Sequence, residues 1–277
     1  MKEIGINTLT SQELYRLLTS TITPRPIAFV SSKDEEGVCN LSPFSFFNIF
    51  SVTPPIIVFS PVNRISDNTK KDTLHNVIKT KQCVVALVNQ RIVQQASLSS
   101  GNYKSSTDEF EKAGFTKIQA SSIDGNLIKE APVNFECKVN QIVELGEKGG
   151  AGNLVICEIV NIHINENILD NENKVDPHKL DIVSRLGHNW YGKTTEESLF
   201  EIAKPIAKFG IGFDNLPQDI INSSILTGNE LAMLASVESI PTEKNKDSIT
   251  LKTEEKHILA KKLLEKGEII EAWKILI

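Results

Sequence analysis

The fold of this 277-residue chain is best predicted from residues 23–61, TPRPIAFVSSKDEEGVCNLSPFSFFNIFSVTPPIIVFSP. The apolar run 27–32, a polar turn and the return at 38–41 predict a β-hairpin. Residues 40–48 then place small hydroxyl and amide side chains among phenylalanines. A plain core strand would favour Val and Ile. The composition of this segment therefore indicates contact with a flat, partly polar ligand.

Other apolar runs extend the prediction to an antiparallel barrel. Residues 56–60 and 83–89 are apolar without alternation, which predicts strands buried on both faces. Residues 133–143 and 154–164 flank a glycine-rich turn and predict a long hairpin. The strands are too short and too closely joined for a series of parallel crossovers. We therefore expect a mainly β fold with inserted helices.

The pattern changes after Tyr191, where the apolar residues recur at helical spacing. The segments with this pattern are 194–208, 215–234 and 254–277, the last interrupted at Gly267. We therefore expect two domains, a barrel domain over 1–192 and an α-helical C-terminal extension over 193–277.

Composition bounds the class of protein. The net charge of −5 disfavours nucleic acid as the main partner. The N-terminal residues lack an apolar signal segment, and no apolar run approaches the ~20 residues of a membrane span. We expect a cytoplasmic protein without membrane association. The four cysteines form no C-x-x-C pair, so we expect no metal site. Because a signal segment is lacking, we expect their thiols to be reduced.

Several motifs, taken in order, resemble the flavin reductase-like, FMN-binding split-barrel family, which includes the flavoredoxins. The motifs are 23–31, 40–48, 54–58, Lys71-Asp72-Thr73 with Asn76, Asp108-Glu109-Phe110 with Ala113-Gly114, and Arg185-Leu186-Gly187 followed by Tyr191. The resemblance implies an antiparallel Greek-key barrel of six strands, usually homodimeric, with FMN in a groove near the dimer interface. The C-terminal extension lies outside the domain that the family shares.

The resemblance also implies where FMN binds. It places segment 40–48 along the isoalloxazine ring and ribityl chain, and Lys71-Asp72-Thr73 at the phosphate. The loop after Arg185 is then free to cover the flavin and meet a nicotinamide. The candidate cofactor-binding residues are Ser31, Ser32, Asn40, Ser42, Pro43, Phe44, Ser45, Phe46, Asn48, Lys71, Asp72, Thr73, Arg185, His188 and Tyr191.

The phosphate site also has a physical basis. A helix that begins near Asp72 and Thr73 presents unpaired N–H groups and the positive end of its dipole. Lys71 adds a full charge, whereas Asp72 would repel phosphate and is assigned to the helix cap. The pattern alone is equally typical of a plain cap beside a solvated lysine. Arg25 is either structural or a partner of a phosphate or carboxylate.

The implied activity is that of an NAD(P)H-dependent flavin oxidoreductase, which transfers hydride from a nicotinamide to FMN held as cofactor or substrate. The flavin carries this chemistry, so we assign no catalytic acid or base. Two alternatives stay open. One is a flavoredoxin-like electron carrier that binds FMN without fast NAD(P)H oxidation, and the other is a non-enzymatic binding protein on the same barrel.

Overall fold

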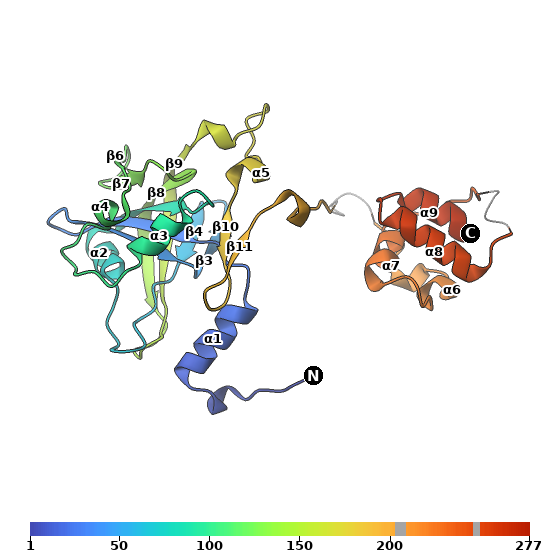
Figure 1. The fold of residues 1–277 in the computed structure, drawn as a ribbon, viewed down its shortest axis with the longest axis horizontal. Coiled ribbons are helices and arrows are strands. Elements are labelled where there is room, and N and C mark those ends of the chain that lie inside the picture. Colours follow the sequence, from blue (N-terminus) through green and yellow to red (C-terminus); the bar gives the residue numbers. More distant parts are fainter. Residues whose placement is uncertain (203–208, 246–249) are drawn as a thin grey trace. The chain divides into compact units, whose positions relative to one another are not determined.

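The computed structural model describes residues 1–202, 209–245 and 250–277. The chain forms two compact units, Met1–Leu199 and Phe200–Ile277 (Figure 1). Each unit has a hydrophobic core of its own. The division into domains at residue 192 stays a prediction. Within the three described ranges, no helix combines the length and apolarity that a membrane span requires.

Unit 1 is built on one antiparallel sheet with the strand order β2-β1-β5-β8-β9-β4-β3. This confirms the predicted fold class, although the described residues form seven strands in this sheet rather than six, because β3 is a separate edge strand. The strands are β1 (Ala28–Lys33), β2 (Cys39–Phe44), β3 (Phe47–Ser51), β4 (Ile56–Phe59), β5 (Gln82–Leu87), β8 (Val133–Glu144) and β9 (Asn153–Ile164). Two small hairpins accompany them, β6 (Lys117–Gln119) with β7 (Asn126–Ile128), and β10 (Val183–Arg185) with β11 (Tyr191–Lys193).

The sheet must curl because of the way β2 leads into β3. These two strands lie at opposite ends of the strand order, yet only Ser45 and Phe46 separate them in the chain. A link of this length reaches about 10 Å at most. The two edges of the sheet therefore approach each other, as in a split barrel. The polar segment at 40–48 forms the corner where they meet.

Strand β1 separates two cores because its side chains alternate between the faces of the sheet. Phe29 packs in one cluster with residues of α3 and α4, whereas Ala28 and Val30 pack in another with residues of α2. Helix α2 thus fills one side of the curled sheet, and α3 and α4 cover the other. The helices of this unit are α1 (Ser11–Thr21), α2 (Asp72–Thr80), α3 (Val93–Ser99), α4 (Glu109–Ala113) and α5 (Pro177–Leu180).

Unit 2 is helical, as expected for the C-terminal extension. Its core surrounds Trp273, which is fully buried and donates a hydrogen bond from Nε1 to the carbonyl oxygen of Leu234 at 3.0 Å. The helices are α6 (Gln218–Ile221), α7 (Gly228–Ala235), α8 (Thr253–Leu264) and α9 (Ile269–Leu276).

The helix predicted over 194–208 is wrong for the part that the structure describes. Residues 194–202 contain one 3-10 turn, Glu196–Ser198. The chain stays extended here because Thr194 continues the β10–β11 pairing, with its N–H and hydroxyl both bonded to the carbonyl oxygen of Ile182. The rest of the prediction, 203–208, lies outside the described residues.

Candidate functional site

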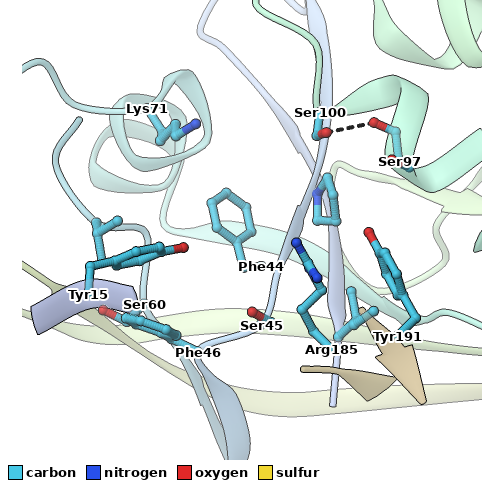
Figure 2. A pocket seen from close by; sticks show the side chains of 13 residues that line it. Tyr15, Phe44, Ser45, Phe46, Ser60, Lys71, Ser97, Ser100, Arg185 and Tyr191 are labelled. Atoms are coloured by element: carbon cyan, nitrogen blue, oxygen red, sulfur yellow. Dashed lines mark hydrogen bonds between the residues drawn. The ribbon is translucent and has the colours of Figure 1, made fainter. Parts of the chain in front are cut away.

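A pocket of about 320 Å³ opens at the corner between β2 and β3. Figure 2 shows Tyr15 and Phe46 on one side of it and Arg185 and Tyr191 on the other. Tyr15 comes from α1, and Arg185 and Tyr191 are partners in the β10–β11 hairpin. The ring pocket, as we call this space, is therefore assembled from segments far apart in the sequence.

The charge around the ring pocket is positive. Lys71 and Arg185 line it, and none of the described lining residues is Asp or Glu. Arg185 donates a hydrogen bond from Nη1 to the carbonyl oxygen of Trp190 at 2.8 Å, and its guanidinium carbon lies 4.6 Å from the centre of the Tyr191 ring. These contacts fix Arg185 against Tyr191, so the pair forms one wall. The pocket favours a ligand with aromatic faces and negative charge.

A second, polar pocket of about 40 Å³ adjoins the first, because Lys71 and Ser100 line both. We call it the anion pocket. The Thr73 hydroxyl, at the start of α2, donates to Oδ1 of Asn40 on β2 at 2.5 Å. Asn40 in turn donates from Nδ2 to the carboxylate of Glu109 at 3.2 Å. This chain of hydrogen bonds holds the beginning of α2 against β2 and α4.

Lys71 places a partly buried positive charge at the site. It is the N-cap residue of α2, and no side chain caps this helix end. Burial, followed by the nearby charge of Arg64, lowers the pKa of Lys71. Within the described part of the chain, its ammonium group has no hydrogen-bond or ion-pair partner. A partly buried cation beside a helix N-terminus is suited to bind an anion.

The assignment of Asp72 to the helix cap is wrong. The helix begins one residue earlier than predicted, so Asp72 occupies its first turn and makes no capping hydrogen bond. Its side chain lines the anion pocket instead.

The structure brings most of the predicted site residues together. Those that line the ring pocket are Pro43, Phe44, Ser45, Phe46, Lys71, Arg185 and Tyr191. Those that line the anion pocket are Asn40, Ser42, Lys71, Asp72 and Thr73.

Four predicted residues lie away from both pockets. Ser31 and Ser32 are buried within β1, where Ser32 accepts a hydrogen bond from Asn76. Asn48 lines a neighbouring apolar pocket, and its Oδ1 accepts from the N–H of Ile49. His188 is exposed in a left-handed backbone conformation, φ 53°, and only its carbonyl oxygen contacts Arg185.

Sequence reasoning missed several lining residues. Tyr15 belongs to an N-terminal helix that carried no motif. Ser97 and Ser100 lie at the end of α3, and the hydroxyl-rich run from 97 to 100 was a signal of the same kind as segment 40–48. The remaining residues are Ile27, Ser60 and Val62 in the ring pocket, and Arg64, Ser99, Gly101, Asn102, Tyr103 and Glu109 in the anion pocket.

The curled antiparallel sheet with a pocket at its corner places the chain among the split-barrel proteins. A family model described as a flavin reductase-like domain matches residues 20–179. The chain therefore belongs to the flavin reductase-like family. The matched segment ends before unit 2 begins.

Individual relatives cover most of unit 1. An uncharacterized protein of Halalkalibacterium halodurans is 35% identical over 205 residues, which are 73% of this chain and 96% of that protein. The crystal structure of nitrilotriacetate monooxygenase component B from Bacillus cereus is similar with a TM-score of 0.68 and 33% identity, covering 73% of this chain and 98% of the other. The 2-nitrobenzoate 2-nitroreductase of Pseudomonas fluorescens is similar with a TM-score of 0.65 and 32% identity, covering 73% and 96%.

Proposed function

We propose that this protein binds FMN and acts as an NAD(P)H-dependent flavin oxidoreductase. Its membership of the flavin reductase-like family supports a flavin ligand. The names of the two similar structures, a monooxygenase component and a nitroreductase, both describe redox proteins. This supports an oxidoreductase rather than a passive binding protein.

The observation that carries the proposal is the position of Lys71. Its unpaired ammonium group lies where the ring pocket meets the anion pocket, beside the uncapped start of α2. FMN joins a flat ring system to a phosphate through a flexible chain. The residues present fit this ligand, with aromatic faces in the ring pocket and with Lys71, Arg64 and a helix N-terminus at the anion pocket. Asp72 and Glu109 also line the anion pocket, and the Glu109 carboxylate accepts hydrogen bonds from Asn40 and from the Leu41 N–H.

The roles of the residues follow from this fit. Lys71 and Arg64 would hold the phosphate beside the first N–H groups of α2, while Tyr15, Phe46 and Tyr191 would face the ring. Bound FMN would supply hydride acceptance at its ring, and the protein supplies orientation and charge. Because Lys71 and Arg185 line the ring pocket without a carboxylate among the described lining residues, the site stabilises negative charge on its ligand.

An anaerobic absorbance titration tests the proposal. The purified full chain is mixed with FMN and then with NADH or NADPH. We expect a flavin spectrum altered by binding, which bleaches on addition of a nicotinamide. A bound-flavin spectrum that ignores both nicotinamides would contradict the reductase and favour the electron carrier. No spectral change with FMN would contradict the flavin site itself.

We also propose that the protein is a homodimer, as members of the family usually are. Edge strand β3 carries Ile49 and Phe50, which are 61% and 68% exposed, and Val52 beside it is 79% exposed. Phe50 also lines the apolar pocket that shares Ser45 and Phe46 with the ring pocket. Such a patch on a sheet edge is typical of an interface.

We also propose a cytoplasmic location. The four cysteines are free and buried, which suits this proposal.

Phe50→Glu is expected to convert a dimer to a monomer, because it places a charge in the centre of the exposed β3 patch. Sedimentation equilibrium of the full chain would report the mass of both proteins. Ile118→Glu is the matched control, since Ile118 is 44% exposed on the separate β6–β7 hairpin. A wild-type protein of monomer mass, or a Phe50→Glu variant that stays dimeric, would contradict the proposed interface.

A further inference from the structure

Arg25 contacts several of the segments that line the ring pocket. Its side chain is buried, with the residue 8% exposed. Nη1 donates to the carbonyl oxygens of Thr19 and Ile22 at 2.5 Å each, at the end of α1. Nη2 donates to the carbonyl oxygen of Leu186 at 3.2 Å, and Nε lies 3.5 Å from the hydroxyl oxygen of Ser45. One guanidinium group therefore joins three segments.

Each of these three segments contributes to the wall of the ring pocket. Helix α1 carries Tyr15, the link between β2 and β3 carries Ser45, and the β10–β11 hairpin carries Arg185 and Tyr191. The planar fork of arginine suits such a junction because its donors point in fixed directions. A lysine could not contact all three segments in the same geometry.

The backbone around Arg25 reinforces the same junction. The N–H of Arg25 donates to the carbonyl oxygen of Arg185 at 3.1 Å, and the reverse bond measures 2.8 Å. Close by, a Cβ atom at Gly187 would lie 2.1 Å from the Ser20 hydroxyl and 2.8 Å from the Ser20 Cα. Only glycine allows the β10–β11 loop to approach the end of α1 this closely.

The guanidinium is engaged mainly within the protein. Four of its five N–H donors are directed at three carbonyl oxygens and a hydroxyl. No described Asp or Glu forms an ion pair with it. A buried charge without a counter-ion is costly, so stability alone does not explain an arginine here, whereas the positioning of the pocket walls does. These contacts favour the structural alternative for Arg25 over the phosphate or carboxylate partner.

We propose that Arg25 is the positioning residue of the ring pocket, holding α1, Ser45 and the β10–β11 hairpin so that they face a planar aromatic ligand from three sides. The identity of that ligand as a flavin rests on the proposed function. Helix α1 is then part of the binding site, with Tyr15 as its contact.

The first test is independent of any ligand. Amide hydrogen exchange of the full chain is compared for wild type, Arg25→Gln and Arg16→Gln. Arg16 is the matched control, an exposed arginine on α1 whose side chain makes no hydrogen bond or ion pair with any described residue and acts on Glu13 only through its charge. Arg25→Gln is expected to speed exchange in both 11–21 and 184–192 by roughly tenfold, with β5 and β8 unchanged. Exchange that is unchanged in these two segments would overturn the proposal.

The second test concerns the pocket. The same variants are titrated with riboflavin and with FMN. Arg25→Gln is expected to weaken both ligands by the same factor, roughly tenfold, because the ring walls and not the phosphate contacts are displaced. A folded variant with faster exchange but unchanged riboflavin affinity would show a structural role only and overturn the positioning role.

Gly187→Ala is a second variant that tests the same junction. It disturbs the same junction without removing the buried charge, so it decides the question if Arg25→Gln does not fold. We expect the same pattern of exchange and the same equal loss for both ligands, and a native pattern would again overturn the proposal. If the wild-type protein binds no flavin, the proposed function fails, whereas the exchange result still decides whether Arg25 holds the walls together.

Discussion

Replacing Glu136 with glutamine is expected to lower the free energy of unfolding of unit 1 by roughly 3 kcal/mol at pH 7. Glu136 lies on β8 and is fully buried. Its carboxylate accepts hydrogen bonds from His163 Nε2 at 2.6 Å, from the Ser121 N–H at 3.0 Å and from the Ser122 N–H at 2.6 Å. An amide at this position turns one acceptor into a donor, so an N–H group that now faces the carboxylate loses its acceptor.

The same carboxylate makes unit 1 sensitive to acid. Burial raises the pKa of Glu136, but the hydrogen bonds from His163, Ser121 and Ser122 outweigh burial and lower it from 4.5 to about 2. A carboxylate with a depressed pKa stabilises the folded state fully above its unfolded value. The contribution is expected to decline as the pH falls from 4.5 towards 2 and to be absent from the glutamine variant.

Urea denaturation followed by circular dichroism, at pH 7 and at steps between pH 5 and 2, would measure both effects. Glu144→Gln is the matched control, because Glu144 lies on the same strand but forms an exposed ion pair with Lys70 at 2.6 Å. Such a surface pair contributes about 1 kcal/mol or less. If the two variants lose equal stability, or if Glu136→Gln keeps the acid dependence of the wild type, the carboxylate does not hold the 121–122 loop to the sheet.

The strands and the family could be predicted from the sequence because their signals are local. The apolar run 27–32 and the alternation of apolar residues from Val133 onward each lie within one hairpin. The observed β8 and β9 match the predicted hairpin closely. The number six came from the family resemblance, and the sheet has β3 as a further edge strand, which begins within the polar segment 40–48 and ends at Ser51.

What the sequence could not reveal depends on contacts between distant segments. The role of Arg25 requires Leu186, which is 161 residues away. The carboxylate of Glu136 is satisfied by a loop 14 and 15 residues earlier that carries no motif. Ser31 matched the family pattern, but the alternation of β1 buries it within the sheet. The residue types of a site can thus be predicted from short stretches of sequence. The contacts between distant segments that orient these residues cannot.

Replacing Lys71 with alanine is expected to weaken FMN binding by roughly 10- to 100-fold while changing riboflavin affinity little. The two ligands share the ring system, and only FMN carries a phosphate. Lys71 is the unpaired cation between the ring pocket and the anion pocket, so its removal takes away a charge-assisted contact that only the phosphate can use. The effect on FMN should also shrink as salt is added, because part of the contact remains exposed to screening.

Lys70→Ala provides the control within the same dipeptide. Lys70 is engaged with Glu144 and lines neither the ring pocket nor the anion pocket, so FMN affinity should stay close to that of the wild type. Fluorescence titration of the two variants with both ligands gives four dissociation constants. Equal losses for FMN and riboflavin in Lys71→Ala would mean that Lys71 supports the ring and does not read the phosphate. A larger loss in Lys70→Ala than in Lys71→Ala would mean that general surface charge, rather than the anion pocket, attracts the ligand.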